Sequence, residues 1–144
     1  MDEKLIPLAH FEELPEFTVG HDVLRYISMP NFLGNEKDSI LYFIGRNLAR
    51  QIEINTLDDL YYLFNKFRWG NLEMVKDRRR TLTFHLMSDD VAQRILSPFD
   101  VDFRLESGFL AEAIEKITNR PCESTETVHE RLYRVQFKVT FTDS

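Results

Sequence analysis

The side chains best suited to catalysis or metal binding are sparse in this sequence, which has one cysteine and four histidines. Only Cys122 and His129 fall within one segment, whereas structural zinc needs about four cysteine, histidine or acidic ligands at set spacings. Cys122 has no histidine beside it, so we interpret it as a buried thiol rather than a nucleophile. A haem would need a histidine on an apolar helix face, and we interpret the one helical candidate, His21, as structural. The sequence therefore predicts no metal, no cofactor and no catalytic residue.

Two arginines and one glutamate have the spacing of a charged site built on helices. Arg46 and Arg50 stand four residues apart, which places them on one helix face, where they can pair with Glu106 or bind an anion. Glu106 begins a later helix, and the helix dipole favours an acid there whether it acts as a cap or belongs to a site. We favour an ion pair within the fold for the arginines.

Two further features are candidates for binding rather than for catalysis. Trp69 stands beside Gly70 at a predicted helix end, where it either packs against the stop or forms a pocket wall. The run Lys76-Asp77-Arg78-Arg79-Arg80 is the one concentrated basic patch in a chain of net charge −6. It is either a solvated hairpin loop or a docking patch for phosphates or an acidic partner, contacted through Lys76, Arg78, Arg79 and Arg80.

Composition limits the class of protein. At 144 residues with 43% hydrophobic side chains, the chain has the size of one domain with a real core. Its sequence pI of about 5.2 disfavours general nucleic-acid binding, which needs a positive surface. A single cysteine suits a reducing compartment. No apolar run reaches the roughly 18–20 residues of a membrane span and no signal peptide is apparent, so we predict a cytoplasmic protein.

Periodicity predicts the elements that must position these residues. Apolar residues at helical spacing, with capping residues at the starts and glycine or proline at the ends, predict five helices. The first spans 19–29 and is ended by Pro30, and the second runs from the N-cap Asn35 to Ile52. The third is capped by Thr56 and ended by a left-handed Gly70, a short fourth is capped by Ser88, and the fifth spans 104–118. Alternating residues predict strands at 72–75, 81–87, 122–128 and 133–141. Gly45 and Ala49, one turn apart, indicate that another backbone approaches the second helix closely.

The order of helices, hairpin, helix and hairpin predicts an α+β fold in which helices pack on one face of an antiparallel sheet. Residues 1–15, interrupted by Pro7 and Pro15, are interpreted as an N-terminal extension, and residues 16–144 as a single domain. Twelve phenylalanines and five tyrosines exceed what one sheet face and four helices are expected to cover. Such a surplus marks an interface, so we predict a homodimer with the N-terminal helices nearest its axis.

Four separated motifs resemble a known family. They are Ser28-Met29-Pro30-Asn31-Phe32-Leu33-Gly34, the stretch Leu41-Tyr42-Phe43-Ile44-Gly45-Arg46-Asn47-Leu48-Ala49-Arg50, Trp69-Gly70, and Leu105-Glu106-Ser107-Gly108-Phe109-Leu110-Ala111-Glu112. In this order and spacing they resemble the YslB-like family of small Gram-positive bacterial proteins over roughly residues 20–142. That family is similar to a fold group containing the 4-vinyl-reductase-like domains, the TRAPP-like transport-particle subunits and the haem domains of nitric-oxide sensors. The resemblance implies an antiparallel sheet backed by helices, often with an apolar pocket and often dimeric.

One departure from the 4-vinyl-reductase-like pattern bears on function. Those domains carry a helix glycine, kept here as Gly108, and two hairpin cysteines, whose positions are occupied here by His129 and Gln136. A thiolate metal site is therefore absent. We predict a non-enzymatic binding or interaction module that takes a small apolar ligand or a protein partner, with neither general nucleic-acid binding nor a membrane span. The alternative is an enzyme, or a carrier or sensor of a haem-like cofactor, as in the related fold group.

Overall fold

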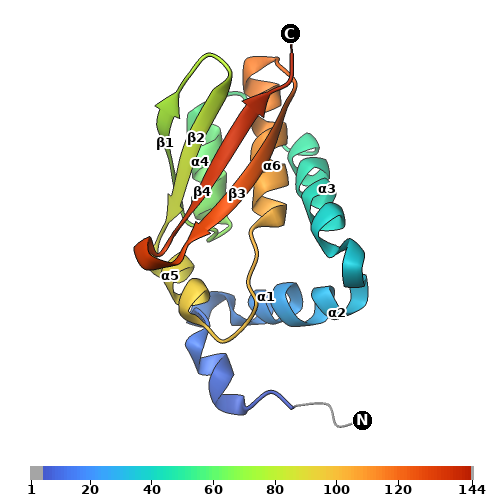
Figure 1. Cartoon of the computed structure of the whole chain (residues 1–144), viewed down its shortest axis with the longest axis vertical. Coiled ribbons are helices and arrows are strands. Elements are labelled where there is room, and N and C mark those ends of the chain that lie inside the picture. The colour runs from blue at the N-terminus through green and yellow to red at the C-terminus, as the bar shows by residue number, and fades with distance from the viewer. Residues whose placement is uncertain (1–4, 144) are drawn as a thin grey trace.

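A four-stranded antiparallel sheet, with strand order β1-β2-β4-β3, forms the centre of the computed structural model, which describes residues 5–143. The strands are β1 (Asn71–Asp77), β2 (Thr81–Met87), β3 (Cys122–His129) and β4 (Arg134–Phe141). Figure 1 shows α4 (Leu57–Lys66) and α6 (Arg104–Thr118) behind the sheet, with α3 (Lys37–Arg50) beside α6. The predicted α+β fold with helices on one face of an antiparallel sheet is confirmed.

The alternation of side chains along the two central strands determines which face of the sheet is covered. The register between β2 and β4 places almost fully buried apolar residues opposite one another: Leu82 with Val139, Phe84 with Phe137, and Leu86 with Val135. Helix α6 lies against this face and against α3, so nine consecutive residues of α6, from Glu106 to Ile114, are buried. Carboxylates carried by this helix are therefore forced to find partners inside the protein.

The predicted close approach at Gly45 is confirmed, and a second glycine takes part in it. A Cβ atom added at Gly45 would lie 2.0 Å from the backbone oxygen of Leu105, and one added at Gly108 would lie 1.9 Å from that of Tyr42. Helices α3 and α6 thus cross in backbone contact at a pair of glycines. Ala49, one turn further along α3, is fully buried.

The first helical segment differs from the prediction at Pro30, which does not end it. The segment runs as α1 (Val19–Val23), a π-helical turn η3 (Leu24–Ser28) and α2 (Met29–Leu33). Pro30 stands at the start of α2, where the missing N–H is tolerated and the wider π turn before it accommodates the ring. Gly34, with φ of 61°, ends the segment.

Helix ends elsewhere agree with the predictions in two cases and differ in two. The Thr56 hydroxyl accepts from the Asp59 backbone N–H at 3.1 Å, and Ser88 caps α5 (Asp89–Leu96). Asn35 is not an N-cap, because it lies in the short turn η4 (Gly34–Glu36) before α3. After α4 the left-handed residue is Arg68, with φ of 57°, while Gly70 has φ of 139°.

The chain before α1 lies partly on the domain. The 3-10 helix η1 (Leu8–Glu13) is followed by the buried Leu14, and the Phe11 ring lies 5.8 Å from that of Phe99. A second short turn, η2 (Glu16–Thr18), leads into α1, and η5 (Glu130–Leu132) joins β3 to β4. The first four residues of the predicted extension fall outside the described residues. Within residues 5–143, no helix has the length and apolar character needed to cross a membrane.

Candidate functional site

Arg46 lies at the centre of a partly buried ionic cluster that joins α3 to α6 and β3. Its guanidinium contacts Glu112 at 3.1 Å, Glu115 at 3.0 Å and Glu123 at 3.2 Å, and donates to the Cys122 carbonyl at 3.0 Å. Burial opposes the charge of Arg46, but the neighbouring hydroxyl and carboxylates outweigh it and raise the pKa of the guanidinium. The charge of Arg46 is thus satisfied by protein groups.

Arg50 shares the face of Arg46, as the spacing predicted, and contacts the same carboxylate. Its Nε lies 3.2 Å from Glu112 Oε1, and its side chain is half exposed. The acid that pairs with the two arginines is Glu112 rather than Glu106. Three carboxylates surround two guanidinium groups in this cluster, so it attracts an anion poorly and acts as a clamp between elements.

Glu106 is buried at the start of α6 and holds an arginine that sequence analysis did not single out. Two hydrogen bonds of 2.9 and 3.1 Å join it to Arg25, which also donates to Asp102 at 2.7 Å. Arg25 and Glu106 are 2% and 3% exposed. Burial opposes the Arg25 charge, and Glu106 with its neighbours outweighs burial and raises the pKa of the guanidinium.

A second buried ion pair fixes the same N-terminal segment to α5. Arg94 Nε lies 3.2 and 3.3 Å from the two carboxylate oxygens of Asp22, which is fully buried, and Arg94 also donates to the Thr18 hydroxyl. Asp22 and Arg25 have the i, i+3 spacing of one helix face. That spacing is the signal in the sequence that Asp22 and Arg25 face the same way. It carries no hydrophobic pattern, because both residues are charged.

Trp69 belongs to an aromatic cluster in the core. Its ring centroid lies 5.0 to 5.2 Å from those of Phe64, Phe67 and Phe109, in edge-to-face arrangements. It is 6% exposed and lines neither of the two cavities described below. The structure therefore places Trp69 as a packing residue at the end of α4.

Cys122 is buried, and its thiol lies 3.2 Å from the Ala111 carbonyl oxygen. Burial raises the pKa of the thiol to about 12, although Arg46 acts in the opposite direction. His129, at the other end of β3, is seven residues away along the strand. The thiolate needed for nucleophilic attack or metal binding is therefore disfavoured at this position.

We expect Cys122 to resist alkylation by iodoacetamide near neutral pH in the folded protein and to react at once in denaturant. The raised pKa also means that the unfolded thiol ionises first, so unfolding should become easier as pH rises from about 9 to about 12. The Cys122→Ala variant, measured by denaturant titration across this window, should lose less stability with rising pH. Rapid alkylation of the native protein would contradict the buried thiol.

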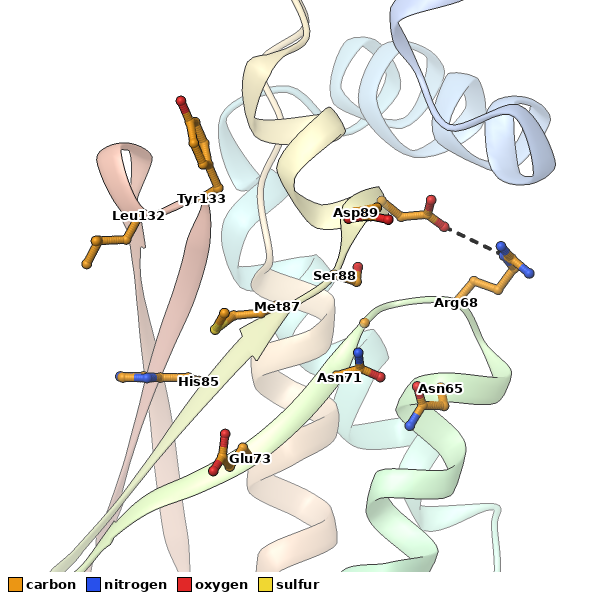
Figure 2. A pocket seen from close by; sticks show the side chains of 12 residues that line it. Asn65, Arg68, Asn71, Glu73, His85, Met87, Ser88, Asp89, Leu132 and Tyr133 are labelled. Carbon is orange, nitrogen blue, oxygen red and sulfur yellow. Dashed lines mark ion pairs between the residues drawn. The ribbon is translucent and has the colours of Figure 1, made fainter.

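A wide polar cavity of about 850 Å³ opens where β1 begins and β2 ends. Figure 2 shows Leu132 and Tyr133 on one side of this polar cavity and Arg68, with its ion pair, on the other. Arg68 Nε lies 3.6 Å from Asp90. With Glu73, Asp89 and Asp90 among its lining residues, the cavity has one arginine against three carboxylates and does not suit an anion.

A second cavity, of about 560 Å³, lies at the opposite end of β1, next to the hairpin loop. We call it the basic cavity. It is lined by three arginines, by polar residues and by apolar side chains: Arg78, Arg79, Arg120, Asp77, Thr118, Leu57, Met74, Leu82, Ile114, Ile117 and Phe141. Lys76 and Asp77 belong to β1, so the loop is shorter than predicted. Of the four candidate docking residues, Arg78 and Arg79 line the cavity, whereas Lys76 and Arg80 do not.

Comparison with known proteins identifies relatives of this chain. The family described as "Protein of unknown function (DUF2507)" matches residues 18–140. The chain is 28% identical to the "Uncharacterized protein YslB" of Bacillus subtilis over 132 residues, which cover 92% of this chain and 89% of the relative. It is 23% identical to the "Uncharacterized protein MJ1642" of Methanocaldococcus jannaschii over 106 residues, 73% of this chain and 64% of that protein.

Among solved structures, the chain is similar to a vinyl-4-reductase family protein from Methanocaldococcus jannaschii. The TM-score is 0.60 and the identity 18%, with 99% of this chain and 85% of that chain covered. At this identity the similarity shows the fold alone. The resemblance to YslB and to the 4-vinyl-reductase-like fold that the four motifs predicted is confirmed.

Proposed function

Because this chain belongs to the DUF2507 family of proteins of unknown function, we propose its role from its surface: it is a non-enzymatic binding module that works as a homodimer. The supporting observation is the distribution of exposed apolar side chains. Within residues 5–143, fourteen large apolar residues are exposed, and eight of them fall in residues 5–44: Leu5, Ile6, Leu8, Phe17, Leu24, Phe32, Phe43 and Ile44.

The N-terminal helical segment buries two charged side chains beside Tyr26 and leaves two large apolar side chains exposed. Its inward side chains include the charged Asp22 and Arg25, each held by a buried partner, whereas Leu24 is 55% and Phe32 90% exposed. A surface helix normally buries its apolar stripe and exposes its charges. Apolar residues turned outward on a helix that is fixed from within support an interface.

A second copy of the chain is the partner that we assign to this surface. Figure 1 shows α2 leading directly into α3 at one edge of the molecule, away from the sheet, and α3 carries the exposed Phe43. A standard interface buries about 800 Å² of each partner, which is roughly a tenth of the 8974 Å² surface of this chain. Twofold symmetry is the commonest closed arrangement of identical chains.

The proposal keeps the single domain over residues 16–144 and the cytoplasmic location expected from the sequence. The free, buried thiol of Cys122 is consistent with a reducing compartment. The alternative of an enzyme or cofactor carrier rests on the fold, and a fold by itself carries no chemistry.

Sedimentation at micromolar protein concentration tests the homodimer. We expect a species of twice the 17.1 kDa chain mass in both low and high salt, because an apolar contact is not screened. Replacing both Phe32 and Phe43 by glutamate should give a monomer that is still folded. Its melting temperature should match that of the parent protein diluted until the parent dimer dissociates. The matched control is Tyr62→Glu, since Tyr62 is 61% exposed on α4, and it should remain dimeric. A parent protein at monomer mass in both salts would remove this proposal.

A further inference from the structure

The basic cavity combines an apolar interior with a charged rim. It lies directly over the edge of the core, where Ile114 is fully buried and Leu82 and Phe141 are 6% and 5% exposed. Leu57, Met74 and Ile117 form half-buried walls. A volume of about 560 Å³ lies within the range of small-ligand sites. The apolar part of the cavity is thus continuous with the hydrophobic core.

The three arginines of the rim are not equivalent. Arg120 is bonded to both carboxylate oxygens of Asp143, at 2.7 and 2.9 Å, lies over the Phe141 ring, and donates to the backbone oxygen of Arg79 at 3.4 Å. Its charge is matched, and its position holds the hairpin loop against the end of α6. Among residues 5–143, neither Arg78 nor Arg79 forms an ion pair, and both are exposed.

The balance of charge at the rim fits a ligand with one small anionic group. Arg78 and Arg79 are opposed by Asp77 in the same rim, while Arg120 and Asp143 cancel, which leaves one net positive charge. With Lys76 and Arg80 added, residues 76–80 carry four cations and one acid, a local charge of +3 on a chain of net charge −6. Guanidinium groups form charge-assisted hydrogen bonds with carboxylate and phosphate oxygens.

We propose that the basic cavity binds a free single-chain amphiphile, with its alkyl chain along Leu57, Met74 and Ile117 and its carboxylate or phosphate head on Arg78 and Arg79. Each buried methylene of the chain adds hydrophobic stabilisation, and the two arginines supply the polar recognition. This inference rests on the proposed binding role but not on the homodimer, because the cavity lies at the hairpin end of the sheet, away from the N-terminal helices (Figure 1).

Isothermal titration tests the site with four probes, each kept below its critical micelle concentration: dodecanoate, dodecyl phosphate, dodecanol and inorganic phosphate. We expect one molecule of dodecanoate or dodecyl phosphate per chain, and much weaker binding of dodecanol and of inorganic phosphate. Replacing both Arg78 and Arg79 by alanine should weaken binding of the two amphiphiles at least about tenfold. The matched control removes two exposed cations elsewhere, by Arg131→Ala with Lys138→Ala, and should bind as the parent does.

A second variant tests the apolar wall. Leu57→Asp places a carboxylate in the first turn of α4, where an acid is favoured by the helix dipole, so the fold should persist while binding of the amphiphiles falls. Equal binding of dodecanol and dodecanoate would overturn the role of the arginines. Binding of inorganic phosphate as tight as that of dodecyl phosphate would overturn the role of the cavity. Binding only to phosphatidylglycerol vesicles, and to neither free amphiphile, would also overturn the proposal.

Sedimentation of the same samples separates this inference from the proposed function. A dimer that binds neither amphiphile would remove the site and leave the homodimeric module in place. A monomer that binds dodecanoate would keep the site and remove the homodimer.

Discussion

Replacing Gly45 by leucine is expected to destabilise the protein by about 3 kcal/mol or more, at the upper end of what overpacking costs. The reason is that the first added carbon would lie 2.0 Å from the backbone oxygen of Leu105 and 2.7 Å from the backbone nitrogen of Phe109. Backbone atoms cannot rotate away as a side chain can, so α3 and α6 must separate. Separation would also loosen the buried contacts of Ala49 and Leu41.

Urea denaturation of three variants checks this result. Gly45→Ala and Gly108→Ala should also lose stability, because a Cβ at Gly108 would lie 1.9 Å from the Tyr42 backbone oxygen. The matched control is Gly20→Ala, where nothing lies within 4 Å of the added carbon. That helical position should be unchanged, or stabilised by up to about 1 kcal/mol, because alanine is the better helix former. Equal stability of parent and Gly45→Leu would show that the two helices do not meet there.

Replacing Glu106 by leucine is expected to cost about 3–5 kcal/mol, because it leaves the buried guanidinium of Arg25 without its main partner. Asp102 remains beside Arg25 at 2.7 Å but supplies a single hydrogen bond from its side chain. Removing one member of a buried ion pair lowers the stability of the fold far more than replacing both members by apolar side chains.

The double variant with Arg25→Met and Glu106→Leu separates these two effects. It should recover most of the lost stability, because both charges are then replaced by apolar side chains of similar size. The control is Asp90→Ala, which removes the partner of the half-exposed Arg68 at 3.6 Å and should cost less than about 1 kcal/mol. A double variant as unstable as the single one would contradict the coupling between Arg25 and Glu106.

Patterns that act over short distances along the chain were sufficient to predict most of the fold. The alternation in β2 and β4 located the buried face of the sheet, and the caps at Thr56 and Ser88 located two helix starts. The helix at 104–118 has the predicted bounds. Each of these signals depends on residues within one or two turns of one another, which a single sequence displays directly.

Pairings between distant segments could not be predicted in the same way. Arg25 and Glu106 are 81 residues apart, and sequence analysis offered Glu106 as a partner of Arg46 and Arg50, which contact Glu112 instead. The inward face of the first helical segment combines Tyr26 with the charged Asp22 and Arg25, and hydrophobic periodicity does not register the charged members. Pro30 was predicted to end a helix, since sequence gives no sign of the π turn that accommodates it.

The residues that line the basic cavity could not be predicted from the sequence for the same reason. The run of arginines was visible in the sequence, but the apolar residues beneath it come from α4, β1, β2, α6 and β4. Only the folded chain brings them together. From the sequence the run was either a solvated hairpin loop or a charged docking patch, whereas the structure places two of its arginines beside apolar side chains.

Native mass spectrometry of the protein purified from its own host tests the central claim most directly. We expect a complex of two chains, each of 17.1 kDa, formed through the apolar surface of residues 5–44. The Phe32→Glu and Phe43→Glu double variant, purified in the same way, should appear as a single chain. A parent protein that is recovered as a single chain, with neither a second copy nor any bound molecule, would contradict the homodimeric binding module.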